Sequence, residues 1–256
     1  MQSEVPVVIL SAIPDDLPYD YIHTDDRRVG YIAMRHLLDL GRRHIAIVTT
    51  HPQAHEEPFA SPEPMYERVL GAYQVLMEVG LAHESCPVFF TSNTSESGRA
   101  VGQKLLSAGS SRPDAIFCTS DTIAFGLLEV FRLGGMHVPG DIAVVSHDGL
   151  AASALSVPAL TTIAPRAREM GTVCVDRLLH LTDTSKEPVT DIVEADLVVR
   201  ASTIGTGLVP PQGISIPISA EHVWSQWRTQ SIPAVYREIP VTCVPLDQII
   251  VREGEL

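Results

Sequence analysis

The chain has 256 residues, of which 45% are hydrophobic, and a formal net charge of −13. This length and composition are ordinary for a globular protein with one large or two small domains and a buried core. The acidic balance, without any run rich in Lys or Arg, argues against unaided binding of nucleic acid, because neutralising phosphates takes a clustered basic face.

Apolar runs alternate with helical patterns along most of the chain. In chain order, strands are expected at 7–10, 45–50, 87–91, 115–119, 142–145, 191–194 and 197–200, and helices at 25–40, 66–79, 95–108, 122–133 and 168–181. Residues 11–24 are expected to form a connection and residues 149–163 a loop. Continuous β-branched strands separated by helices favour a parallel sheet covered by helices on both faces.

Helix ends and the last part of the chain have their own signals. Asp25 and Asp121 stand where the N-caps of two predicted helices belong. An N-cap also explains the pair Asp25-Asp26 more simply than a magnesium or phosphate-acceptor site does. Proline interrupts the residues after about 205, so residues 205–256 are predicted to be an irregular tail.

Three polar residues are expected at one edge of the sheet. Ser120 and Asp148 follow two predicted strands, and Arg68 begins the helix after an earlier strand. The carboxyl ends of parallel strands form a common edge, where ligands bind in open α/β sheets. An arginine fork donates paired hydrogen bonds, and a carboxylate accepts bonds from hydroxyl groups. The sequence therefore predicts ligand contacts at this edge.

Each of these candidates also has a purely structural interpretation. Arg68 suits a surface ion pair with Glu67 or Glu63, and Asp148 suits a turn before a glycine. Phe117 lies inside a predicted strand, where it can offer its ring face to a ligand. A phenylalanine in a buried strand is more often part of the core.

Enzymatic and metal-dependent functions find little support. The adjacent residues Ser146, His147 and Asp148 suggest a catalytic triad, but neighbours on an extended strand point to opposite faces and are not expected to converge. The cluster His51, His55, Glu56 and Glu57 carries zinc-binding groups, yet it sits in a proline-interrupted loop without a recognised ligand spacing. We therefore expect no enzymatic activity, no metal and no cofactor.

Cysteine usage and hydropathy bear on the compartment. The four cysteines are far apart and lack a CxxC spacing, which indicates neither a zinc site nor a disulfide framework. No stretch approaches the ~18 apolar residues of a membrane span, and the first residues do not form a secretion signal. A cytoplasmic protein without membrane association is the expectation.

Seven motifs between Val5 and Ile204 occur in a recognisable order. They include PVVIL at 6–10, HLLDLGRRHIA at 36–46, ER at 67–68 with GAY at 71–73, DAIF at 114–117, VPGDIAVV at 138–145, LTTI at 160–163 and LVVRAST at 197–203. In this order they resemble the effector-binding domain of LacI/GalR-family transcriptional regulators, whose fold is that of periplasmic sugar-binding proteins.

The resemblance implies an α/β fold of two lobes with parallel sheets flanked by helices. Residues 24–163 and 197–204 would form a complete C-terminal lobe. Residues 1–23 and 164–196 would form a truncated N-terminal lobe, because the first strands and helices of the family have no counterpart. The helix-turn-helix that binds operator DNA would also be absent from this chain.

The resemblance further implies a function. A small effector, most simply a sugar, would bind between the lobes at Arg68 and Asp148, with Ser120 standing where many relatives carry Asn. Effector binding would shift the closure of the lobes. In a complete regulator, this would change the affinity of the helix-turn-helix for operator DNA. Homodimers are usual in the family. The alternatives are a sugar-binding protein of a transport system and a non-functional fragment.

Overall fold

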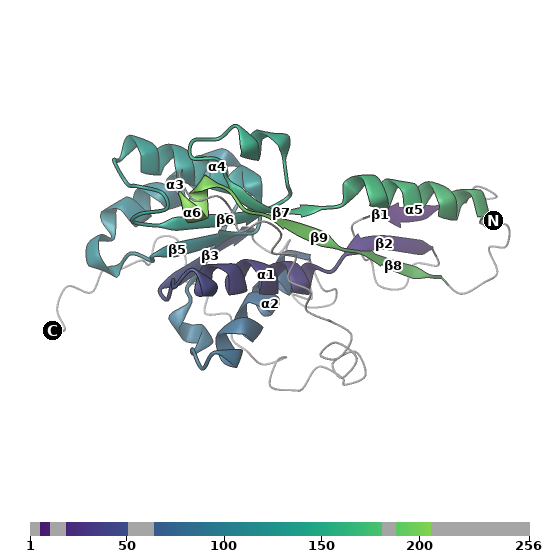
Figure 1. The fold of residues 1–256 in the computed structure, drawn as a ribbon, viewed down its shortest axis with the longest axis horizontal. Helices are drawn as coiled ribbons and strands as arrows, with labels where there is room; N and C mark the ends of the chain where they lie inside the picture. Colours follow the sequence, from purple (N-terminus) through teal and green to yellow (C-terminus); the bar gives the residue numbers. More distant parts are fainter. Residues whose placement is uncertain (1–5, 11–18, 51–63, 181–187, 206–256) are drawn as a thin grey trace.

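Two β-sheets organise the chain (Figure 1). The computed structural model describes residues 6–10, 19–50, 64–180 and 188–205. The larger sheet has the strand order β4-β3-β5-β6-β7-β9, and the smaller sheet has the order β1-β2-β8. All neighbouring strands are parallel except the edge pair β7 and β9. The expected α/β fold with mostly parallel sheets flanked by helices is confirmed.

The elements have the following bounds. The strands are β1 (Val8–Leu10), β2 (Asp20–Thr24), β3 (Ile45–Thr50), β4 (Val88–Thr91), β5 (Ala115–Cys118), β6 (Ala143–His147), β7 (Thr161–Pro165), β8 (Thr190–Val193) and β9 (Ala195–Val198). The α-helices are α1 (Asp26–Asp39), α2 (Pro64–Glu78), α3 (Ser95–Ser107), α4 (Asp121–Leu133), α5 (Ala167–His180) and α6 (Ala201–Ile204). Short 3-10 helices are η1 (His83–Ser85), η2 (Gly109–Ser111) and η3 (Ala151–Ala154).

Most of the expected elements are present, with ends that differ by at most two residues. Two strands were missed: β2 lies in the expected connection, and β7 lies in the expected loop. Both carry polar residues that the fold buries. Thr161 and Thr162 of β7 are fully buried because their hydroxyl groups find partners on distant elements. The local sequence does not show which distant residues will pair with these hydroxyl groups.

Strand residues alternate between two cores, one on each face of the larger sheet. On β3, Ile45 and Ile47 belong to the core that includes α1 and α2, whereas Ala46 and Val48 belong to the core with α3 and α4. Figure 1 shows these two helix pairs on opposite faces of the sheet. Because strand side chains alternate with a period of two, a continuous apolar run supplies both cores.

Close backbone contact joins α1 to α2. A Cβ atom built on Gly30 would lie 1.7 Å from the carbonyl oxygen of Arg68, and one built on Gly71 would lie 1.8 Å from the carbonyl oxygen of Arg27. These distances are far below van der Waals contact, so only glycine allows the two helices to approach this closely. The crossing places the first turns of α1 and α2 side by side.

The smaller sheet has a simpler arrangement. Figure 1 shows α5 lying along it beside β1 and β2. Arg177 of α5 donates to Asp191 of β8, and its Nε lies 3.7 Å from Asp20 of β2. None of the residues of α5 is fully buried, and Leu179 is 73% exposed. Among the described helices, none has the length and hydropathy needed to cross a membrane.

The helix α6 packs at the amino-terminal ends of β6 and β7 in the larger sheet, next to α1. Ser202 donates to the carbonyl of Val144 at 2.6 Å and accepts from the amide of Thr161 at 2.8 Å. Next to it, the Thr203 hydroxyl lies 3.0 Å from Nε2 of His36 on α1. Burial lowers the pKa of His36 to about 4, although the charge of Asp39 acts in the opposite direction.

His36 is expected to make stability depend on pH. Since its pKa is about 4 when folded and near 6.5 when unfolded, protonation favours the unfolded state as the pH falls from 6.5 toward 4. The loss is about 3 kcal/mol at full protonation. Urea unfolding across this range should show it. His36→Gln keeps a nitrogen near the Thr203 hydroxyl but does not titrate, so its stability should fall less. Equal losses in both proteins would contradict the assignment.

Candidate functional site

The site lies where the chain crosses between the two sheets. The carboxyl ends of β3, β5 and β6 share one edge of the larger sheet, and β7 runs parallel to β6 and continues past this edge toward α5 (Figure 1). β2 reaches the same region and ends at Thr24, just before α1. The parallel strands thus direct their following loops toward the crossing, which is the place where the sequence predicted ligand contacts.

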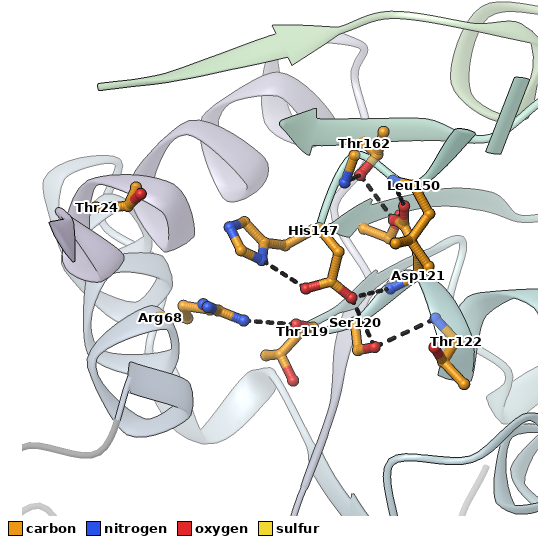
Figure 2. Close-up of polar contacts among 12 residues, drawn as sticks. Thr24, Arg68, Thr119, Ser120, Asp121, Thr122, His147, Leu150 and Thr162 are labelled. Carbon is orange, nitrogen blue, oxygen red and sulfur yellow. Dashed lines mark hydrogen bonds and ion pairs between the residues drawn. The ribbon is translucent and has the colours of Figure 1, made fainter. Parts of the chain in front are cut away.

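Three of the predicted residues meet at this edge (Figure 2). Arg68, on α2, donates from Nη1 to the carbonyl oxygen of Thr119 at 2.7 Å. The next residue, Ser120, donates from Oγ to Oδ2 of Asp148 at 2.9 Å. Residues from three separate parts of the sequence therefore form one connected polar network.

Asp148 is the centre of this network. Its Oδ2 also accepts a hydrogen bond from the amide of Asp121 at 3.1 Å, and its Oδ1 lies 3.1 Å from Nδ1 of His147. Partial burial acts to raise the pKa of Asp148, but the bonds from His147 and Ser120 and the charge of Arg68 together hold it below its usual value. The group is a carboxylate at neutral pH and can accept further bonds, because its side chain is 31% exposed.

The backbone of Asp148 adopts a conformation that non-glycine residues rarely take, with φ of 129°. The amide of Asp148 donates to the carbonyl of Ile163 at 3.2 Å, and Gly149 follows with φ of 67° and a bond from its amide to the Thr162 hydroxyl. Such strain costs about 1–3 kcal/mol and clusters at functional sites. The turn before Gly149 that the sequence suggested is therefore present, and its strained backbone holds the Asp148 carboxylate in place at the sheet edge.

Ser120 has a structural role in this arrangement. It is fully buried and is the N-cap of α4, where its Oγ accepts a bond from the amide of Thr122 at 3.2 Å. The expectation that Asp121 caps this helix is wrong, because the Asp121 carboxylate turns inward. By contrast, Asp25 is the N-cap of α1, as expected, and accepts from the amide of Arg28.

Asp121 is the residue whose role sequence reasoning missed. Its side chain is fully buried and accepts four bonds. The donors are Ser146 Oγ, Thr162 Oγ1 at 2.7 Å, the Leu150 amide at 2.8 Å and Ser153 Oγ at 2.6 Å. This carboxylate ties the start of α4 to β6, β7 and η3, and so holds the loop that carries Asp148.

Arg68 is buried and held in place by several partners. Its Nε donates to Asp26 Oδ1 at 2.7 Å, and Nη1 also lies 3.3 Å from the sulfur of Met65. The suggested pairing with Glu67 does not occur, since Glu67 instead takes two bonds from Arg27. Among the described residues none makes a hydrogen bond to Nη2 of Arg68. One edge of the guanidinium therefore has no protein partner in the described part of the chain.

Phe117 lies in the core between the larger sheet and the helices α1 and α2. Its side chain has no exposed surface, and it stands opposite Val145 in the β5–β6 register. The structural interpretation of this residue therefore holds, and its ring face is covered by the core. We leave it out of the proposed ligand contacts.

The side chains of the adjacent residues Ser146, His147 and Asp148 do not all point the same way. Ser146 donates to Asp121, away from the histidine. His147 and Asp148, however, contact each other, so the expectation that neighbours here point to opposite faces is wrong for this pair. The positive φ of Asp148 ends the extended geometry on which that expectation depended.

His147 has one satisfied and one unsatisfied ring nitrogen. The residue is 4% exposed, and its Nε2 is buried without a hydrogen-bond partner in the described part of the chain. A buried acceptor without a donor costs about 1–3 kcal/mol. Burial lowers the pKa of His147, against the hydrogen bond that its Nδ1 donates to Asp148, and the charge of Arg68 lowers the pKa further. The ring is therefore neutral near pH 7.

Metal binding finds no group of ligands within the described ranges: no three His, Cys, Asp or Glu side chains gather there in a way that could hold an ion. The cluster of His51, His55, Glu56 and Glu57 lies outside the described residues. So do Cys243 and the predicted tail. Cys86, Cys118 and Cys174 are free thiols.

Two sheets joined by crossing strands, with a polar network at the crossing, define an α/β protein of the two-lobed ligand-binding class. Comparison with known proteins agrees. The model of the periplasmic binding protein-like domain matches residues 34–203, and the chain belongs to this family.

The relatives are transcriptional regulators by name. The chain is 30% identical over 168 residues to the HTH-type transcriptional regulator DegA of Bacillus subtilis. The aligned region covers 66% of this chain and 47% of DegA. It is 30% identical over 206 residues to the HTH-type transcriptional repressor PurR of Aliivibrio fischeri, covering 79% of this chain and 58% of PurR. The chain thus spans about half the length of these curated relatives. The expected resemblance to LacI-type regulators is confirmed.

A solved structure agrees with the fold. A LacI-family transcriptional regulator from Enterococcus faecium with bound ribose superposes with a TM-score of 0.68 at 26% identity. The match covers 78% of this chain and 71% of that chain. The similarity extends over the larger part of both chains.

Proposed function

We propose that this chain is the effector-sensing domain of a LacI-type transcriptional regulator and binds a small, uncharged, sugar-like ligand at Arg68 and Asp148. The observation that carries the proposal is the ionised, partly exposed carboxylate of Asp148. It is held in a strained conformation at the sheet edge where the chain crosses between sheets. Ser120 takes part by orienting that carboxylate.

The charges at the site favour an uncharged ligand. The positive charge of Arg68 is already paired with Asp26, so Asp148 leaves the described site with a net negative charge. An anionic ligand such as a sugar phosphate would meet repulsion, whereas hydroxyl groups can donate to the carboxylate. The ribose bound by the Enterococcus faecium regulator fits this chemistry.

The two-sheet architecture suggests how binding would be transmitted. Residues 1–23 and 164–196 form one lobe in this proposal, and residues 24–163 with 197–204 form the other. A ligand that contacts both lobes favours their closed arrangement and changes the protein's affinity for operator DNA. DNA itself would be bound by a helix-turn-helix outside these 256 residues, since the names of DegA and PurR describe such proteins.

Pairing of two copies of the chain is part of the proposal. Apolar side chains that follow β6 are exposed, among them Leu155 at 83% and Val157 at 69%. Clustered apolar exposure of this kind is typical of surfaces that are covered on association. We propose a cytoplasmic homodimer without enzymatic activity, in line with relatives that are named as regulators.

A thermal melt with a panel of compounds tests the proposed function. Ribose, other neutral sugars, sugar phosphates and purines are added in turn. A ligand that binds only the native state adds RT ln(1 + [L]/Kd) of stability, about 2.7 kcal/mol at a concentration of one hundred times Kd. We expect a neutral sugar to raise the melting temperature and sugar phosphates to leave it unchanged. A transition that no compound moves would overturn the proposal.

Arg68→Ala extends this test to the site. The variant should bind the same sugar more weakly by about 1.5–3 kcal/mol, the range for a hydrogen bond to a charged group. Arg68→Lys, which keeps the charge beside Asp26, is the control for folding. Calorimetry that finds unchanged affinity in a folded Arg68→Ala protein would remove Arg68 from the site.

A further inference from the structure

We propose that His147 is a specificity-determining residue of the ligand site, whose Nε2 accepts a hydrogen bond from a hydroxyl or N–H group of the ligand. The inference rests on the proposed function, because it names a group that reads the ligand at that same site. Neither the sequence prediction of Arg68, Ser120 and Asp148 nor the network around Asp148 assigns a role to this nitrogen.

The position of the ring supports the proposal. His147 is the last residue of β6 and directly precedes Asp148, so its ring lies at the carboxyl edge of the sheet. Figure 2 shows the ring on the same side of the network as the guanidinium of Arg68.

The hydrogen bond to Asp148 decides which role the free nitrogen can take. Asp148 is ionised and can only accept, so Nδ1 of His147 must carry the proton that lies between them. In the neutral ring the other nitrogen, Nε2, then has a lone pair and no proton. Nε2 is therefore an acceptor that only a donor group can satisfy.

The described residues offer no such donor to Nε2. The nitrogen is buried and has no partner there. Arg68, the cationic donor nearby, gives its Nε to Asp26 and its Nη1 to Thr119, and its remaining nitrogen, Nη2, makes no hydrogen bond to Nε2 of His147. A native structure seldom leaves a buried acceptor unpaired, and such exceptions call for an explanation. A donor supplied by the ligand is that explanation.

The pair formed by His147 and Asp148 has a chemical preference. The carboxylate and Nε2 both accept, so together they suit a ligand with two donor groups close to each other, such as a vicinal diol. A ligand that offers only acceptors here would leave Nε2 unpaired. Because Nε2 is covered in this conformation, pairing also requires a shift of the ring or of its surroundings, which couples recognition to rearrangement.

Two substitutions separate the two nitrogens of the ring. In His147→Asn the amide reaches about as far as Nδ1, so it can keep the bond to Asp148 while the group at the Nε2 position is lost. In His147→Gln the amide reaches about as far as Nε2 and restores an acceptor there. The experiment measures the melting temperature of the wild-type chain and both variants, with and without D-ribose and a panel of other neutral sugars.

We expect a sugar that stabilises the wild-type chain to lose at least tenfold in affinity for His147→Asn and to regain part of it with His147→Gln. An independent readout is the ¹⁵N resonance of Nε2, which should move to lower frequency when that sugar is added, as for an acceptor that gains a hydrogen bond.

Two other outcomes would count against the inference. A sugar that stabilises the wild-type chain and both variants equally, with an unmoved Nε2 resonance, would overturn the role of His147 and leave the proposed function standing. Wild-type protein with a cooperative transition that no sugar shifts would overturn the proposed function, and this inference with it. Melting temperatures without sugar report any general loss of folding in the variants.

Discussion

Gly30→Ala is expected to destabilise the chain by about 3 kcal/mol or more, since an added methyl group would overlap the backbone of α2. The Cβ would lie 1.7 Å from the carbonyl oxygen of Arg68 and 2.6 Å from its carbonyl carbon. Backbone atoms cannot rotate away as a flexible side chain can. The two helices must separate, and one of the two cores of the larger sheet depends on their contact.

The same substitution should also affect the site. Arg68 lies at the helix crossing, and its guanidinium reaches Asp26 and Thr119 only if the helices keep their spacing. We therefore expect Gly30→Ala to lower the unfolding free energy in urea and to weaken any stabilisation by sugar.

Gly171→Ala is the matched control for Gly30→Ala. Gly171 is also inside a helix, but a Cβ there meets no heavy atom within 4 Å. Alanine should then stabilise the chain by about 0.5–1 kcal/mol through its higher helix propensity. If both variants changed stability by the same amount, close packing of α1 on α2 would not be the reason for glycine at position 30.

Asp121→Ala is expected to cost about 3–5 kcal/mol, because it removes the shared acceptor of several buried donors. Three hydroxyl groups and the Leu150 amide bond to this carboxylate. The hydroxyl groups can turn toward other acceptors, but the amide cannot. The loop that carries Asp148 would lose its attachment to α4, so sugar binding should fall together with stability.

Two further variants test why Asp121→Ala is expected to lose stability. Asp121→Asn keeps one oxygen for Leu150 and Ser153, so we expect a smaller loss than for alanine. Glu129→Gln removes a carboxylate from the exposed face of the same helix, where it pairs with Arg99, and should change little. Urea unfolding followed by circular dichroism measures all three. Wild-type stability in Asp121→Ala would show that the network adds nothing to the fold.

Much of the fold was predictable because apolar periodicity is local. The strands β3, β5 and β6 each begin with a continuous apolar run, which is a clear local signal. The strand β2 was not predictable, since Asp20 and His23 break its apolar pattern and only pairing with β1 and β8 makes it a strand. The polar strand β7 was missed for the same reason.

That the candidate residues lie close together was predictable, but the contacts they make were not. Arg68, Ser120 and Asp148 lie together at one sheet edge because parallel strands end there. The sequence did not reveal that Arg68 pairs with Asp26 or that Ser120 caps α4. These features depend on which helix packs on which strand.

The sequence by itself determined the alternation of strands and helices, the two-sided core and the edge at which polar residues collect. All three follow from residue spacing within about ten positions, which sets which face of a strand or helix is apolar. Only the tertiary structure decided the partners of the polar groups. The hydroxyl donors to Asp121 come from 25 to 41 positions away, and Asp26 lies 42 positions from Arg68. The hydrogen-bond partners of buried carboxylates and histidines are set by which elements pack together in the fold. Their roles therefore depend on long-range contacts that no local sequence pattern contains.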